Sequence, residues 1–210
     1  SEDGSPDRTN FRQAAQDLSR DIRRISRDSE LVSVKSSEPR VIVVGASAGG
    51  LNALEAFFCG VPAACQDTFI VVQHLSADHE SAMVKLLEPH ANLPVVEASE
   101  AVAMAPGSIY ACPPGKIIRF EGEALQLDSL AEDYKTGTLP INLGTESAST
   151  VFGARAVAVI LSGTGADGTA GCRMIRDLGG QVAVQSPASA EFSGMPKSVI
   201  SAGLSDVVAP

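Results

Sequence analysis

The pattern of apolar and polar positions changes near residue 39 of this 210-residue chain. After a polar start, apolar residues recur at spacings of four and three, with Arg and Asp on the other face. This spacing predicts one amphipathic helix, formed by Phe11, Ala15, Leu18, Ile22 and Ile25. The polar stretch "DSELVSVKSSEPR" then predicts a linker. We therefore divide the chain into an N-terminal tail, helix and linker at 1–39 and one larger domain at 40–210.

From residue 40 onward, continuous apolar runs alternate with amphipathic segments. The runs "VIVV", "FIVV" and "VAVIL" predict buried strands, whereas 49–60, 78–90 and 167–180 predict helices and 139–153 a weak one. A hairpin is expected over 116–127, with its turn at Glu121–Gly122. Continuous apolar strands that alternate with helices are typical of parallel sheets. We therefore expect an α/β fold with a doubly wound, mainly parallel, Rossmann-like sheet, helices on both faces and a small β-hairpin.

Composition narrows the function classes. With 44% hydrophobic and 20% charged residues the chain is typical of a globular protein, and its net charge of −9 argues against binding to nucleic acid. No apolar run approaches the ~18 residues of a membrane helix and no signal peptide opens the sequence, so we expect a cytoplasmic protein without membrane insertion. The four cysteines lack metal-ligand spacing, which predicts free buried thiols, no metal and no cofactor.

Three loops with candidate chemistry each follow a predicted strand: "GASAGG" at 45–50, "QHLSADH" at 73–79 and "SGTGADG" at 162–168. Ligands of open parallel sheets bind at the carboxyl ends of the strands. Whatever its chemistry, we expect the functional site at this edge.

The first loop fits the pattern G-x-S-x-G, a tight strand-to-helix turn that exposes the hydroxyl of a nucleophile, here Ser47. A packing loop or a phosphate-binding loop at the start of a helix is the alternative for this segment. The stretch lacks the G-x-G-x-x-G spacing and a Walker A lysine, so a nucleotide-binding Rossmann domain is disfavoured.

The other two loops offer a base and a residue to orient it. An imidazole can take the serine proton during attack, and His74 ends the second strand. A carboxylate that binds the other ring nitrogen steadies the base, and Asp167 occupies the third loop. A partly buried structural histidine and a helix N-cap are the respective alternatives. The order Ser…His…Asp differs from the order Ser…Asp…His of the α/β-hydrolases.

Five segments in series resemble the catalytic domain of bacterial chemotaxis protein-glutamate methylesterases. They are "VIVVGASAGGLNALEAF", "FIVVQHLSADHESAMVKLL", "VAMAPGSIYACPPGK", "VAVILSGTGADGTAGCRMIRDLGGQVAVQ" and "SAEFSGMPKSVISAG". The resemblance implies hydrolysis of glutamate methyl esters on the cytoplasmic helices of chemoreceptors, with release of methanol, and in some members deamidation of glutamine. It places the nucleophile on Ser47, the histidine on His74 and the aspartate on Asp167.

The resemblance also implies an oxyanion and substrate-binding region. Main-chain N–H groups of the turn and of the third loop would hold the oxyanion, and the "SGMP" segment would shape the mouth for the glutamyl side chain; these positions are Ala46, Ala48, Gly49, Thr164, Gly165, Gly194 and Met195.

Several positions depart from the family pattern. Ala48 stands where threonine is common, Thr164 replaces a methionine, and Ile117–Ile118 replace a frequent histidine. Ala48 supports the alternative that the chain is a weak or inactive binding and regulatory module. Residues 1–39 are too short for a receiver domain, so we expect an excised domain or a variant that adjoins a receptor methyltransferase.

Overall fold

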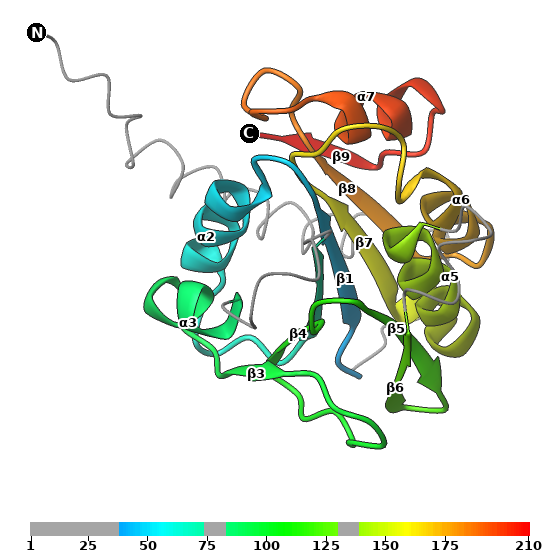
Figure 1. The fold of residues 1–210 in the computed structure, drawn as a ribbon. Helices are drawn as coiled ribbons and strands as arrows, with labels where there is room; N and C mark the ends of the chain where they lie inside the picture. Colours follow the sequence, from blue (N-terminus) through cyan, green and yellow to red (C-terminus); the bar gives the residue numbers. More distant parts are fainter. Residues whose placement is uncertain (1–37, 74–82, 130–138) are drawn as a thin grey trace, which may run out of the picture.

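The computed structural model describes residues 38–73, 83–129 and 139–210. Its centre is a seven-stranded sheet with the order β3-β4-β2-β1-β7-β8-β9, in which every pair of neighbours is parallel (Figure 1). The strands are β1 (Val41–Ala46), β2 (Thr68–Gln73), β3 (Val95–Glu97), β4 (Ile109–Ala111), β7 (Ala156–Ile160), β8 (Gln181–Gln185) and β9 (Val207–Ala209). The predicted parallel α/β sheet is confirmed.

Helices cover both faces of this sheet. One face carries α2 (Gly50–Gly60) and α3 (Met83–Leu87), which continues into the 3₁₀ turn η1 (Glu88–His90). The other face carries α5 (Pro140–Phe152) with its 3₁₀ turn η3 (Gly153–Arg155), α6 (Thr169–Asp177), α7 (Gly194–Ser201) and the hairpin of β5 (Lys116–Glu121) and β6 (Ala124–Ser129). Figure 1 shows α2 and α3 on one side of the strands and α5 and α6 on the other.

The strand order reverses beside β1. From β1 the chain adds β2, β3 and β4 on one side, and it later returns to add β7, β8 and β9 on the other side. In open parallel sheets, the point at which the order reverses leaves a crevice at the carboxyl ends of the two strands. The loops after β1 and β7 therefore meet where a site is expected.

Alternate residues of β1 pack into two separate cores. Ile42 and Val44 face α2, in a core with Phe57, Phe58 and Phe69 whose rings meet edge to face at 5.1–6.1 Å. Edge-to-face packing is the favoured arrangement of aromatic rings. Val41 and Val43 face the core beneath α5. Burial on both faces explains why β1 is continuously apolar.

Most sequence predictions agree with the described elements. The segment 139–153 forms a full helix of 13 residues, and the hairpin turns at Gly122–Glu123, one residue later than predicted, because Glu121 pairs with Ala124. The predicted helix around Leu18 and the first part of 78–90 lie outside the described residues. All four cysteines are free, but only Cys172 is buried; Cys59, Cys65 and Cys112 are half-buried.

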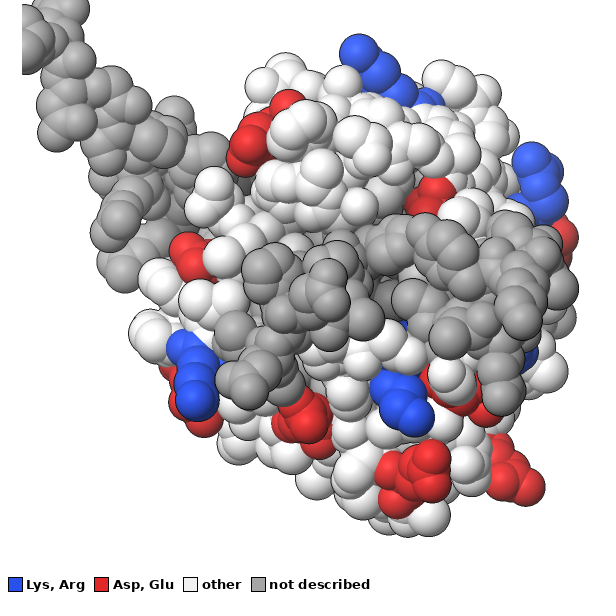
Figure 2. Space-filling view, viewed as in Figure 1, with Lys and Arg blue, Asp and Glu red and all other residues white. Residues whose placement is uncertain are grey.

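None of the helices within the described ranges is both long and apolar enough to cross a bilayer. Figure 2 shows Lys and Arg side chains standing singly on the described part of one face, between acidic and uncharged surface.

Candidate active site

Ser47 occupies a three-residue turn between β1 and α2. The six residues of β1 are all buried, whereas Ser47, Ala48 and Gly49 are half-buried. Gly49 has φ +65°, in the left-handed region that favours glycine, and it is the N-cap of α2. The carbonyl of Ser47 accepts a hydrogen bond from Gly50 N at 2.9 Å. The strand thus ends in a tight turn that lifts the serine out of the sheet.

Ser162 connects three loops by hydrogen bonds. It is the second residue after the end of β7. Its carbonyl accepts the N–H of Ser47 at 3.0 Å, and its hydroxyl donates to the Ala48 carbonyl at 2.9 Å. The same hydroxyl accepts the N–H of Phe192 at 2.9 Å, and Ser162 N donates to Oε1 of Gln185 at 2.8 Å. Ser162 is 1% exposed, so water does not compete for these bonds. It fixes the backbone on both sides of Ser47.

We expect Ser162→Ala to lower the free energy of unfolding by about 1–3 kcal/mol, because it leaves the Ala48 carbonyl and the Phe192 N–H without their partner. The turn of Ser47 would loosen as well, so the reactivity of its hydroxyl should fall more than the folded fraction does. Ser149→Ala is the matched control: Ser149 is equally buried, but its hydroxyl donates to Glu146 of its own helix. Urea unfolding and labelling of Ser47 with a serine-reactive probe on both variants test this; equal effects would show that Ser162 has no special role.

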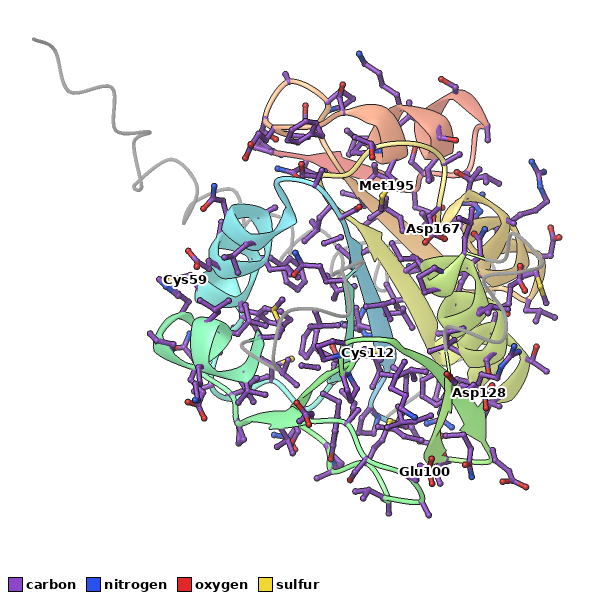
Figure 3. All side chains as sticks on the ribbon, in the orientation of Figure 1. Cys59, Glu100, Cys112, Asp128, Asp167 and Met195 are labelled. Carbon is purple, nitrogen blue, oxygen red and sulfur yellow. The ribbon has the colours of Figure 1, made fainter. Side chains whose placement is uncertain are left out.

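The segment around Gly194 packs tightly against the loop after β7. Gly163 N donates to the Phe192 carbonyl at 2.9 Å, and Met195 N donates to the Gly163 carbonyl at 2.9 Å. A Cβ on Gly163 would overlap Sδ of Met195 and lie 3.0 Å from Cβ of Ser47. Met195 is fully buried, so it supports the loop from beneath. Figure 3 shows Met195 and Asp167 at the same end of the molecule, opposite Glu100 and Asp128.

Asp167 is buried (6% exposed) and its carboxylate binds the start of α5. Oδ2 accepts the N–H of Ile141 at 3.1 Å, and Oδ1 accepts the N–H groups of Asn142 at 2.9 Å and Gly168 at 2.8 Å. The N-cap of α5 is Leu139, whose side chain has no acceptor, so Asp167 caps this helix from another loop. Its own helix α6 has Gly168 as N-cap. The alternative considered for Asp167 therefore applies to α5 and not to α6.

His74 lies outside the described residues. Gln73, which precedes it, ends β2 and pairs with Ala46, the residue before Ser47. The register of the sheet thus aligns the last residues of β1 and β2.

The remaining predicted residues are of two kinds. Some offer main-chain N–H groups without an acceptor, and others have buried side chains. Within the described part of the chain, the N–H groups of Ala48, Gly49, Thr164 and Gly165 have no hydrogen-bond acceptor, whereas that of Ser47 is bound to Ser162. Those of Ala48 and Gly49 lie at the start of α2, where N–H groups attract negative charge, whereas those of Thr164 and Gly165 lie in the loop before α6. The side chain of Ala46 is fully buried against α2, so it faces the core.

Two of the four cysteines, Cys112 and Cys172, have a raised pKa and do not compete as nucleophiles. Burial raises the pKa of Cys172 to about 12. Burial also raises the pKa of Cys112 to about 12, with a smaller contribution from Glu97, against a hydrogen bond to the Ile118 backbone that lowers it. Both side chains are therefore neutral thiols near pH 7, and only a thiolate attacks. Among the described residues, no group of three His, Cys, Asp or Glu side chains could hold a metal ion.

Two contributors to this region were missed in the sequence. Ser162 stands inside the quoted stretch "SGTGADG", and only its position after the strongest apolar run could have indicated it. Glu191 lies in the loop after β8, inside the quoted segment "SAEFSGMPKSVISAG", from which only Gly194 and Met195 were singled out; its carboxylate lies against Gly49.

The sequence model of the CheB methylesterase family matches residues 42–210. The chain belongs to this family. The match covers β1 from its second residue, all the other strands of the sheet and the loops after β1 and β7.

Relatives agree with this assignment. A putative protein-glutamate methylesterase/protein-glutamine glutaminase from Leptospira interrogans is 32% identical over 80% of this chain and 86% of its own length. A protein-glutamate methylesterase/protein-glutamine glutaminase from Methanosarcina acetivorans is 29% identical, and the match covers 84% of this chain but 52% of that protein. The crystal structure of the CheB methylesterase catalytic domain of Thermotoga maritima is similar with a TM-score of 0.74, at 26% identity over 81% of this chain and 92% of that one.

Proposed function

We propose that this chain is a serine hydrolase that demethylates glutamate methyl esters on the cytoplasmic helices of chemoreceptors. The observation that carries the proposal is the turn of Ser47, fixed by Ser162 at the point where the strand order reverses, in a chain of the CheB methylesterase family. The catalytic unit is 40–210, and the protein acts in the cytoplasm, where these helices lie. Deamidation of receptor glutamines is a second reaction of the same site, supported by the names of the relatives.

The chemistry follows the general course of serine hydrolases. His74 takes the proton of the Ser47 hydroxyl while its oxygen attacks the ester carbonyl carbon. The tetrahedral intermediate collapses, and methanol leaves with the proton that His74 returns. Water, activated by the same imidazole, then releases the glutamate carboxylate and restores Ser47. Asp167 holds the imidazole in the tautomer that this sequence requires.

The oxyanion binds to main-chain N–H groups. Those of Ala48, Gly49, Thr164 and Gly165 are supported for this role because none has an acceptor within the described residues. Each such donor stabilises the transition state by roughly 3 kcal/mol in comparable sites. A main-chain role explains why Ala48 and Thr164 can replace other side chains at these positions.

Ala48 also favours a second candidate function, a module that binds methylated receptors but no longer hydrolyses them. The two functions differ in the reactivity of Ser47. A fluorophosphonate probe reacts only with an activated serine, so it separates them directly.

We expect one equivalent of a fluorophosphonate probe to label the protein, and Ser47→Ala to abolish labelling without a change in thermal stability. Ser201→Ala, an exposed serine at the end of α7, is the control and should label as the parent does. Mass spectrometry of the labelled peptide identifies the site, and methanol release from a peptide with a glutamate methyl ester tests turnover. A folded protein that remains unlabelled would support the binding module.

A further inference from the structure

Glu191 places a negative charge beside the turn that carries Ser47. A Cβ built on Gly49 would lie 2.8 Å from both Cβ and Oε2 of Glu191 and 2.9 Å from its Cδ. The carboxylate therefore lies against the backbone two residues after Ser47. Glu191 is exposed, so no core packing requires an acid there.

The backbone on both sides of Glu191 is fixed. Ala190 N donates to the Ser186 carbonyl at 3.0 Å, and Phe192 N donates to Oγ of Ser162 at 2.9 Å. The Phe192 carbonyl in turn accepts from Gly163, whose position is next to Cβ of Ser47. The loop that carries Glu191 is thus bound to the same residues that position Ser47.

The Glu191 carboxylate lies beside a part of the site that attracts anions. Helix α2 has 11 residues, no acidic residue in its first turn and no side-chain cap on Gly49. The positive end of its dipole and the unbonded N–H groups of Ala48 and Gly49 would hold a carboxylate as readily as an oxyanion. The proposed reaction converts a neutral ester into such a carboxylate. Without a counteracting charge, the product would be retained where it forms.

We propose that Glu191 is a specificity-determining residue that disfavours binding of the carboxylate product relative to the neutral ester. The inference rests on the proposed function for the identity of ester and product. Because the same charge opposes the oxyanion, Glu191 also slows acylation of Ser47. One side chain thus has two opposite effects on turnover: it speeds release of the carboxylate product and slows attack by Ser47.

A charge series at position 191 tests this. In the Ser47→Ala protein, two peptides that differ only in a glutamate or its methyl ester are titrated by calorimetry. The ratio of ester to acid affinity should fall about 1.5- to five-fold in Glu191→Gln, the range of exposed charge pairs, and further in Glu191→Lys. The difference should shrink between 20 mM and 0.5 M salt, since exposed charges are screened.

The proteins that retain Ser47 give the kinetic counterpart of the calorimetry. Fluorophosphonate labelling should accelerate in the order Glu, Gln, Lys, and the acid peptide should inhibit the variants more strongly than the parent. The same series at Glu100, an exposed glutamate at the opposite end in Figure 3, is the control and should change neither quantity.

Three results would overturn the role of Glu191. The ratio of ester to acid affinity could be equal in the Glu, Gln and Lys proteins, it could change equally in the Glu100 series, or it could be independent of salt. Calorimetry needs no turnover, so its outcome is independent of whether the parent hydrolyses the ester. A parent that binds both peptides with the expected ratio but is never labelled at Ser47 would instead refute the proposed function.

Discussion

Asp167→Asn should lower ester hydrolysis near neutral pH by about 10⁴-fold. The estimate comes from triads in which the amide holds the imidazole in the wrong tautomer. The loss should be in kcat, because an orienting carboxylate touches the base and not the substrate. Methanol release from a methyl-ester peptide, measured on the purified variant, checks the size of the effect.

The structure changes what the same variant should do to stability. Asparagine normally caps a helix about as well as aspartate. Here both carboxylate oxygens accept backbone N–H groups, from Ile141 on one side and from Asn142 and Gly168 on the other. An amide nitrogen on either side would face a donor, so we expect a loss of about 1–3 kcal/mol in the free energy of unfolding. Reduced stability alone is therefore no evidence about the triad.

A second substitution separates the two roles of Asp167. Leu139, the N-cap of α5, has φ −101° and ψ 125°, a backbone conformation that suits a capping serine. In the double variant Asp167→Asn/Leu139→Ser, the new hydroxyl should recover part of the lost stability. Activity should stay low if Asp167 orients His74. Recovery of activity together with stability would show that Asp167 only caps α5, and the triad would be wrong.

Gly163→Ala should reduce kcat/KM for a small ester by about 100-fold, the effect of displacing a reacting group by about 1 Å. The new methyl group would overlap Sδ of Met195 and press on Cβ of Ser47 at 3.0 Å. Overpacking should also cost about 1–3 kcal/mol of stability. Esterase kinetics and thermal unfolding measure the two effects.

Two further variants locate the cause. In Gly163→Ala/Met195→Ala the sulfur is removed, so the overlap with it disappears while the contact with Ser47 remains. Activity should stay low in this double variant. Gly203→Ala, at a glycine with φ +69° and open space around it, adds backbone strain without overlap, whereas Gly163 is not among the described glycines with positive φ. Gly203→Ala should therefore leave activity unchanged. Parental activity in Gly163→Ala would show that the turn of Ser47 tolerates displacement.

The sequence predicted the sheet well because burial on both faces makes its central strands continuously apolar. Such runs are visible without any knowledge of tertiary contacts, and Gly-rich stretches mark where they end. Helix α5 was expected to be weak; in the structure its N-cap, Leu139, offers no capping side chain, and Gly144 lies in its interior. Its stability comes from Asp167 and from packing of Ile141 over Gly45, which are tertiary contacts. No local pattern contains them.

For the candidate site, the sequence indicated positions in loops but not their contacts, and the triad stays a prediction. Ser47 and Asp167 could be proposed because each stands in a Gly-rich loop after an apolar strand. Ser162 and Glu191 were not proposed, since their significance depends on distant residues: the hydroxyl of Ser162 reaches Ala48, 114 positions away. An exposed glutamate in a loop has no signature in sequence.

The reversal of strand order beside β1 has a consequence for how the chain folds. β1 pairs with β2 through a short crossover, but its other partner, β7, is separated from it by most of the domain. Pairings between such distant segments close a large loop and are slow to form. The N–H of Ser47 can bind the Ser162 carbonyl only when the distant strand β7 lies beside β1. The turn of Ser47 therefore takes its final form only after β7 has paired with β1, so the setting of the serine depends on the second half of the sheet.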